Sequence, residues 1–167
     1  MHDLDDIVKT VVGKVLDEGA VPGSPKRAPL SRMTLQAAKV LAAYVEEQAA
    51  VMGVNAVVAV SDASGNLMLC ECMDDAFLAS RDIAINKAYT VTALKMPTKA
   101  LASLAAPGGS LYGIQFTNGG KIVIFGGGEP LESGGKIVGG VGVSGGTAEE
   151  DTKLGEIAKR YFETHIA

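Results

Sequence analysis

Two apolar runs of strand length lie close together in the sequence, at residues 54–61 (VNAVVAVS) and 67–73 (LMLCECM), with only residues 62–66 (DASGN) between them. Asp, Ser, Gly and Asn are turn-forming residues, so the pattern predicts a β-hairpin. A connection of this length joins antiparallel neighbours and is too short for the crossover that parallel strands need. The hairpin therefore restricts the fold to one with an antiparallel sheet.

The rest of the domain alternates between helical and extended patterns. Helices are predicted at residues 33–52, 75–94, 98–104 and 147–162. Further strands are predicted at residues 121–125 (KIVIF), 129–131 and 136–143. Thr34 and Gly53 supply start and stop signals for the first of these helices, and residues 147–150 (TAEE) form a capping box for the last. This order predicts an α+β fold in which helices pack on an antiparallel sheet, and not a doubly wound parallel sheet.

Residues 1–19 carry the pattern of a separate amphipathic helix. Apolar side chains recur there at i, i+3, i+4 spacing opposite a charged face, at Leu4, Ile7, Val8, Val11, Val12 and Val15. Residues 20–30 contain three prolines and predict an extended linker, so the globular domain is expected to cover residues 31–167. A helix tethered in this way is expected to dock on a partner, with folding back onto its own domain as the alternative.

The composition argues against several classes of partner. A net charge of −4 gives no general attraction to nucleic acid. No apolar run reaches the roughly 18 residues that a membrane span needs, and the acidic start of the sequence does not resemble a secretory signal. With only two cysteines, the sequence is typical of a reduced cytoplasmic protein.

Glycine is concentrated in one part of the chain, because 15 of the 21 glycines lie within residues 108–146. This indicates either tight loops or a subunit interface. Residues 140–145 (GVGVSG) match the G-x-G-x-x-G pattern, but no strand with a ribose-binding acid follows, which argues against a dinucleotide site. The backbone N–H groups of residues 144–147, which include Gly145 and Gly146, have two interpretations. They hold a carboxylate or phosphate, or Thr147 and Glu150 simply cap the helix, and capping is favoured.

Few side chains in the domain are suited to metal binding or nucleophilic catalysis. The two histidines lie near the ends of the sequence, so neither a histidine-based zinc site nor a Ser-His-Asp triad is expected. Cys70 and Cys72 share one side of a strand, where a disulfide between them would be badly strained. Inert packing is the default for this pair, whereas Cys70, Cys72 or Met68 could reach an iron or cobalt centre as a soft ligand. Lys87 is expected to be a solvated helix lysine.

Several phrases resemble, in the same order, the GlcG/HbpS family, which includes the C-terminal domain of PduO-type cobalamin adenosyltransferases. They are residues 58–62 (VAVSD) with Gly65, 79–90 (ASRDIAINKAYT), 96–98 (MPT) with Leu101, 107–113 (PGGSLYG), 118–120 (NGG), 127–131 (GGEPL) and 137–146 (IVGGVGVSGG). The resemblance implies a profilin-like fold that forms dimers or larger rings. It also implies an association with haem binding and, in some members, with haem degradation or redox sensing.

The family often carries a histidine after the hairpin glycine, where this sequence has Asn66. If that histidine is an axial haem ligand, Cys70 or Met68 must substitute for it here. The resemblance thus implies a site for haem, or alternatively a corrinoid, with Cys70 as the metal ligand and Lys87 at a propionate. The cofactor-binding residues expected on this basis are Asn66, Met68, Cys70, Cys72, Lys87, Gly145 and Gly146.

The amphipathic helix and its linker resemble the encapsulation peptides that direct cargo into bacterial microcompartments. This implies docking on shell proteins and a cytoplasmic location inside such a compartment. The leading interpretation is a homo-oligomeric, tetrapyrrole-binding accessory protein that supports cofactor maintenance or redox and is not primarily an enzyme. Two alternatives stay open: an enzyme acting on haem or a small acid, and an oligomeric scaffolding or cargo protein without a ligand. The adenosyltransferase domain of PduO is absent, so its ATP-dependent activity is not expected.

Overall fold

A computed structural model of the protein describes residues 28–167, so the predicted helix at 1–19 and most of the linker lie outside the described residues. A single antiparallel sheet with the order β2-β1-β4-β3 consists of β1 (Val57–Asp62), β2 (Leu67–Cys72), β3 (Gly128–Ser133) and β4 (Lys136–Ser144). The main helices are α2 (Leu35–Met52), α3 (Leu78–Leu94), α4 (Thr98–Leu104) and α5 (Ala148–Tyr161). Short helical turns lie at Ile114–Phe116, Asn118–Gly120 and Phe162–Ile166.

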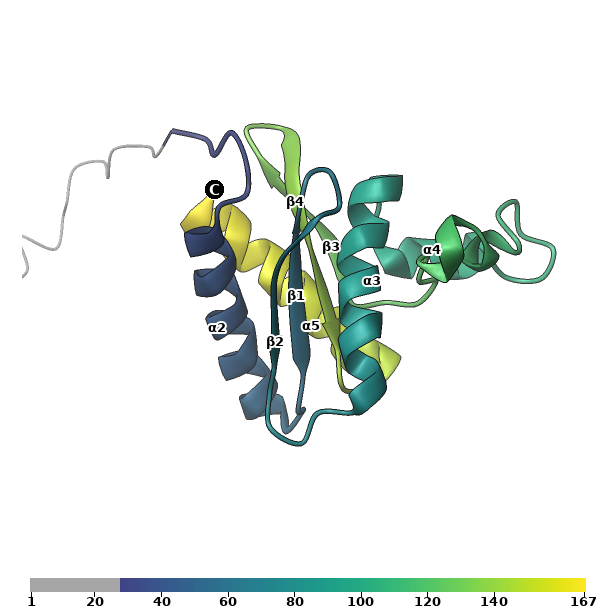
Figure 1. The fold of residues 1–167 in the computed structure, drawn as a ribbon, viewed down its shortest axis with the longest axis horizontal. Coiled ribbons are helices and arrows are strands. Elements are labelled where there is room, and N and C mark those ends of the chain that lie inside the picture. The colour runs from purple at the N-terminus through teal and green to yellow at the C-terminus, as the bar shows by residue number, and fades with distance from the viewer. Residues whose placement is uncertain (1–27) are drawn as a thin grey trace, which may run out of the picture.

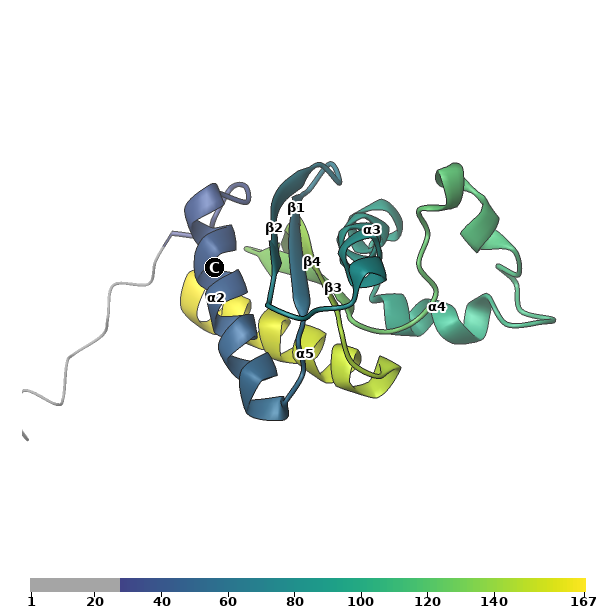
Figure 2. The same ribbon diagram turned by 60° about the horizontal axis from the view of Figure 1, so that its bottom comes forward.

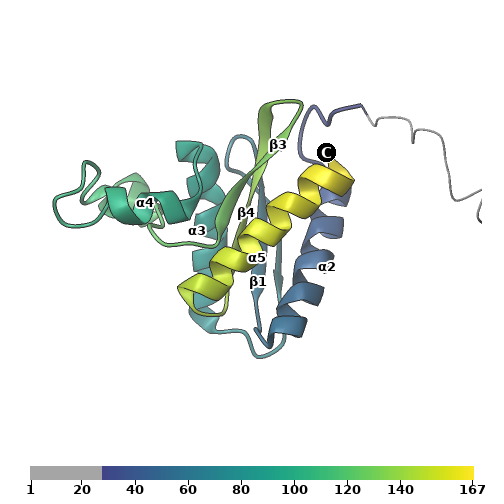
Figure 3. The same cartoon turned by 180° about the vertical axis from the view of Figure 1, so that it is seen from behind.

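Helix α3 covers one face of the sheet, and α2 and α5 cover the other (Figure 1, Figure 2). The predicted α+β architecture is therefore confirmed. The larger core lies on the α2–α5 face, where α5 crosses the sheet diagonally (Figure 3). Val58 and Val60 of β1 and Val141 and Val143 of β4 contribute to this core, because side chains two positions apart on a strand share a face. Phe162, which directly follows α5, is completely buried there.

The helix boundaries follow the capping signals of the sequence. The Thr34 hydroxyl accepts a hydrogen bond from the Ala37 N–H at 3.1 Å, and Gly53 ends α2 with a positive φ of 70°. At the start of α5, the side chain of Thr147 and that of Glu150 each accept a hydrogen bond from the other residue's backbone N–H. The predicted capping box is therefore confirmed.

Glycines of β4 allow α3 to lie directly on the sheet. A Cβ on Gly142 would collide with the carbonyl oxygen of Ala84, and a Cβ on Gly140 would collide with the side chain of Val91. Both glycines belong to the G-x-G-x-x-G pattern, and β4 runs antiparallel to β1. The pattern thus serves helix–sheet packing in this fold, consistent with the expectation that it binds no dinucleotide.

The strand predicted at residues 121–125 is wrong. Val123 is buried, but its backbone N–H donates to the Thr90 hydroxyl of α3 at 3.0 Å instead of to a neighbouring strand. β-branched residues suit a buried, extended segment whether or not it pairs with a neighbouring strand, so their pattern does not distinguish the two. The edge strand is instead β3, which is longer than the edge piece predicted at 129–131 and contains Pro130, a residue tolerated at sheet edges.

The predicted helix at residues 75–94 begins later, at Leu78, because Asp75 adopts a left-handed conformation with φ of 62° that a continuing helix excludes. Beyond α3, helix α4 and the segment that follows it project sideways from the body of the domain (Figure 1). Tyr112 and Phe116 are exposed on this projection. Among the described residues, no helix is long and apolar enough to span a bilayer.

Candidate functional site

Strand β2 carries the sulfur-bearing residues of the predicted site, and the structure divides them between the two faces of the sheet. The register of the β1–β2 pair shifts between Val60 and Ser61, and Met68 is left without a partner in a β-bulge. Met68 packs against the core on the α2 side. Cys70 lies opposite Ala59 and packs against the small apolar cluster beneath α3. The three predicted soft ligands therefore belong to two separate environments.

Met68 lines a cavity of about 430 Å³ between the hairpin and the start of α2, which we call the hairpin cavity. This volume is within the range of small-molecule sites. Apolar residues provide part of its wall, and Arg32 is the one cationic residue among those that line it. The lining residues are Ser31, Arg32, Met33, Thr34, Leu35, Asp62, Ala63, Ser64, Met68 and Val138.

Two backbone N–H groups attach the segment before α2 to the sheet and so close one side of the hairpin cavity. The Met33 N–H donates to the Val138 carbonyl at 3.2 Å, and the Leu30 N–H donates to the Ser133 hydroxyl at 2.8 Å. Because Arg32 lies between these two attached residues, it is held where it lines the cavity. The sequence gives no signal for Arg32, because it lies in an irregular segment about 30 residues from the hairpin and no periodic pattern connects the two.

A hydrogen-bonded turn fixes the hairpin end of the cavity. Asp62 Oδ1 accepts from the N–H groups of Ser64 and Asn66 at 2.8 and 2.9 Å, and Oδ2 accepts from Asn66 Nδ2 at 3.0 Å. Partial burial alone would raise the pKa of Asp62, but these hydrogen bonds outweigh it and the pKa is lowered. The interpretation of Asp62 as a turn residue is confirmed, and the Asn66 side chain is engaged in the same turn.

Cys70 and Cys72 lie on the other side of β2, with Cys70 partly buried and Cys72 exposed. Both are free thiols. Burial raises the pKa of Cys70 to about 11, the adjacent Cys72 thiol adds to this rise, and Arg81 partly opposes it. The Cys70 thiol must therefore lose a proton before it can bind a metal ion as a thiolate, at a cost that a thioether does not carry.

Lys87 is not a solvated helix lysine, because it is completely buried at the centre of the domain. Its Nζ donates to Asp151 Oδ2 and to the Val143 carbonyl, both at 2.7 Å, and lies 4.9 Å from the centre of the Phe125 ring. Burial lowers the pKa of Lys87, while the ion pair with Asp151 opposes that shift. The ammonium group ties α3 to β4 and α5, and this interior position does not suit contact with a cofactor propionate.

The sequence contained a signal for this burial. Lys87 lies three residues after Ala84 and four before Val91, so the helical period places it on the apolar stripe of α3. The general preference of lysine for solvent overrode that signal in the prediction.

Gly145 and Gly146 lie beside a further cavity of about 440 Å³ at the start of α5. The Gly146 N–H donates to Asp151 Oδ1 at 2.9 Å, and the Thr147 N–H donates to Glu150 Oε2 at 2.8 Å. The Thr147 bond belongs to the predicted capping box, whereas the Gly146 N–H is taken by Asp151, outside that box. Neither of these two N–H groups is free to hold an anion.

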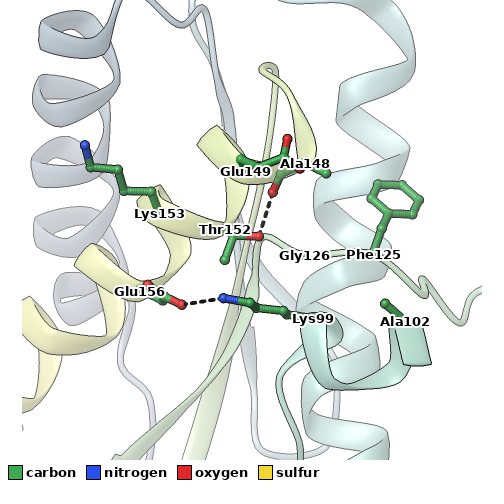
Figure 4. A pocket seen from close by; sticks show the side chains of 9 residues that line it. All are labelled: Lys99, Ala102, Phe125, Gly126, Ala148, Glu149, Thr152, Lys153 and Glu156. Carbon is green, nitrogen blue, oxygen red and sulfur yellow. Dashed lines mark hydrogen bonds and ion pairs between the residues drawn. The ribbon is translucent and has the colours of Figure 1, made fainter. Parts of the chain in front are cut away.

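A separate cavity of about 360 Å³ between α4 and α5 is shown in Figure 4. Lys99 Nζ lies 3.4 Å from Glu156 Oε1 there, and the Thr152 hydroxyl donates to the backbone carbonyl of Ala148. None of the residues predicted at the cofactor lines it. Within residues 28–167, no group of three or more His, Cys, Asp or Glu side chains is arranged to hold a metal ion.

The fold and these sites can be compared with known proteins. A family model described as "Haem degrading protein HbpS-like" matches residues 33–159. The chain belongs to this family. The 15.0 kDa protein of the dhaT-dhaS intergenic region of Citrobacter freundii is 48% identical over 137 residues, which cover 82% of this chain and 96% of that protein.

Two further relatives concern PduO. The corrinoid adenosyltransferase PduO of Citrobacter freundii is 35% identical over 94% of this chain but only 47% of its own length, so the chain spans about half of that relative. A solved structure described as a PduOC:heme complex is 35% identical, with a TM-score of 0.74 over 77% of this chain and 94% of the other. The HbpS-like resemblance inferred from the sequence is thereby confirmed.

Proposed function

We propose that the domain binds a tetrapyrrole, either haem or a corrinoid, in the hairpin cavity. One observation carries this proposal: the chain has the fold of a 35% identical domain whose structure was solved with haem. Its HbpS-like family membership supports the same ligand class. Because the chain spans about half of PduO, the activity of the whole PduO protein is not part of the proposal.

The residues of the hairpin cavity meet the chemical requirements of haem. Haem binding requires apolar contacts for the macrocycle, a donor for the iron and positive charge for the propionates. Met33, Leu35 and Val138 provide apolar surface, Met68 provides a thioether, and Arg32 provides a guanidinium group. Bound haem would supply ligand-binding or electron-transfer chemistry at its iron, and the thioether of Met68 is the donor we propose for it.

Met68 is a better candidate than Cys70 for two reasons. It lines the same cavity as Arg32, whereas Cys70 packs on the opposite face of the sheet. The thioether also needs no deprotonation, whereas burial raises the pKa of the Cys70 thiol to about 11. Our proposed donor therefore differs from Cys70, the metal ligand expected from the sequence.

Titration of the full-length protein with haem, followed by absorption spectroscopy, tests this proposal. We expect a saturable Soret shift at one haem per chain. Arg32→Gln should weaken binding several-fold through loss of a propionate partner, whereas Lys136→Gln, at a position that does not line the hairpin cavity, serves as the matched charge control. A featureless titration, or equal effects of the two charge changes, would contradict the proposed site.

Asn66 offers a gain-of-function version of the same test. The family resemblance implies a histidine at its position, and other residues of the same turn, Asp62, Ala63 and Ser64, line the hairpin cavity. We expect Asn66→His to bind haem more tightly than the natural protein and to alter its Soret spectrum, because imidazole is a stronger iron donor than an amide. An unchanged affinity and spectrum would mean that this turn does not face the cofactor.

We further propose that the protein is packaged in a bacterial microcompartment, in the cytoplasm, by residues 1–19. The amphipathic pattern of these residues and the relationship to PduO support this proposal. Co-expression of the intact chain with shell proteins should give co-sedimentation, and Val8→Asp with Val12→Asp should abolish it while leaving haem binding intact. Sedimentation of the double variant with the shell would contradict it.

We also propose a homo-oligomer. The outer edges of β2 and β3 are unpaired in the sheet, and Tyr112 and Phe116 are exposed on the projecting segment after α4. Light scattering of the natural protein should give a multiple of the chain mass, and Phe116→Ser should reduce it. A monomer at micromolar concentration would contradict this proposal.

A further inference from the structure

The pair of thiols on β2 has an arrangement that the haem proposal does not use. Cys70 and Cys72 are two positions apart on an edge strand, so their side chains project from the same face. The two thiols are near enough to interact electrostatically, since Cys72 is, after burial, the next cause of the raised pKa of Cys70. Cys72 is exposed, so the pair is accessible from solvent.

Geometry disfavours a disulfide between these thiols. Two residues on an extended strand are separated by about 6.7 Å, with their Cβ atoms projecting side by side rather than toward each other. A disulfide needs Cβ atoms about 3.8 Å apart and sulfurs about 2.05 Å apart. A single metal ion with bonds of about 2.3 Å to each thiolate needs sulfurs only about 4.6 Å apart, which side-chain rotation can supply.

We infer that Cys70 and Cys72 form a two-coordinate site for a soft monovalent cation, Cu(I). Thiolates select Cu(I) over harder ions, and a linear pair of donors satisfies it. Zn(II) would need further ligands, and none of the residues from 28 to 167 add a third His, Cys, Asp or Glu to this pair. The site is independent of the hairpin cavity, because it lies on the opposite face of the sheet.

Binding is a ligand exchange without oxidation or reduction. Both S–H bonds break, two S–Cu bonds form, and two protons pass to the buffer, so the site changes from neutral to a net charge of −1. Arg81, near the start of α3, is close enough to oppose the raised pKa of Cys70 and so to stabilise this negative charge. Asp82 acts in the opposite direction.

Anaerobic titration of the full-length protein with Cu(I), in competition with the chromophoric chelator bicinchoninate, tests the inference. We expect one Cu(I) per chain, protection of both thiols from a thiol reagent, and a sulfur-to-copper charge-transfer band in the ultraviolet. Cys72→Ser should weaken Cu(I) binding by more than about 100-fold, because loss of a ligand costs more than loss of a residue that only orients a ligand. Because Cys72 is exposed, this variant should remain folded. Arg81→Gln should weaken binding by about 2- to 5-fold, as expected for an exposed charge.

Met68→Leu is the matched control, since it removes a sulfur from the other face of the same strand. It should leave Cu(I) binding unchanged, whatever its effect on haem. Retention of the full affinity in Cys72→Ser would overturn the inference. A stoichiometry of one Cu(I) per two chains would also overturn it, because the ion would then bridge two molecules. Failure of haem binding alone would contradict only the proposed function.

Discussion

The centre of the sheet and its β2 edge use polar and polarizable side chains in opposite ways. At the centre, the ammonium group of Lys87 is enclosed by Asp151, the Val143 carbonyl and the Phe125 ring, and all of these contacts are internal. At the edge, Met68 lines a cavity and Cys72 is exposed, so sulfur donors can reach a ligand. The comparison shows that a charged residue can be purely structural while less conspicuous residues form the accessible chemistry.

The edge itself contains a second contrast. A single bulged residue moves Met68 to the α2 face, while Cys70, two positions later, lies beneath α3. Without the register shift, residues two apart would project from the same face. The bulge therefore creates two sulfur environments from one short strand.

The largest loss of stability is expected from removing the buried Lys87–Asp151 ion pair at the centre of the sheet. Lys87→Met leaves Asp151 buried without its partner and should reduce the free energy of unfolding by about 3–5 kcal/mol. Denaturant unfolding of the natural and variant proteins measures this difference. Adding Asp151→Leu should recover part of the loss, because the unpaired charge is removed. A loss below 1 kcal/mol in Lys87→Met would show that the ion pair does not organise the centre.

A smaller loss is expected at the contact between β4 and α3. Gly142→Ala places a Cβ against the Ala84 carbonyl and should cost about 1–3 kcal/mol of unfolding free energy through overpacking. Gly135→Ala provides a contrast without crowding, since nothing lies within 4 Å of the added Cβ, although its φ of 75° adds backbone strain. A thermal melt of both variants should show more destabilisation in Gly142→Ala. The reverse order would contradict the packing role of the β4 glycines.

Glu129, a buried residue of β3, should make the free energy of unfolding depend on pH. Burial raises its pKa to about 6, with Lys159 opposing and Glu156 adding to the rise. Since the folded-state pKa lies above the unfolded value, the protein should lose stability as pH rises from about 4.5 to 6, by roughly 1 kcal/mol after allowance for solvent screening. Glu129→Gln should remove this part of the pH dependence in denaturant unfolding at pH 4.5 and 7. The same pH slope in both proteins would contradict the assignment to Glu129.

The smallest effect on stability is expected at the thiol edge. Cys72→Ser changes an exposed side chain and should alter the free energy of unfolding by less than about 0.5 kcal/mol. Denaturant unfolding without added metal measures this. A much larger loss would mean that the thiol pair stabilises the fold and is not simply available to a ligand.

Much of the fold could be predicted because its signals are local. Thr34, Gly53 and the Thr147–Glu150 box mark helix ends through bonds within one turn, and the Asp62–Asn66 turn defines the hairpin. The family resemblance was equally accessible, because it rests on short phrases in a fixed order.

The features that were missed depend on contacts distant in sequence. Residues 121–125 look like a strand, yet Thr90 of α3 takes the backbone hydrogen bond of Val123 that a neighbouring strand would have taken. Arg32 reaches the hairpin only through the attachment of Met33 to Val138. No local pattern encodes these contacts, so the division of the sulfur donors and the charge beside Met68 became visible only in the folded domain.

The most direct test of two separate sulfur environments is the Soret spectrum of haem-titrated Met68→Leu beside that of the Cys70→Ala/Cys72→Ala variant. We predict that Met68→Leu shifts or weakens the band, whereas the double cysteine variant matches the natural protein in band position and affinity. Loss of the band in the cysteine variant, with a natural spectrum in Met68→Leu, would contradict this account and place the tetrapyrrole on the α3 side of β2.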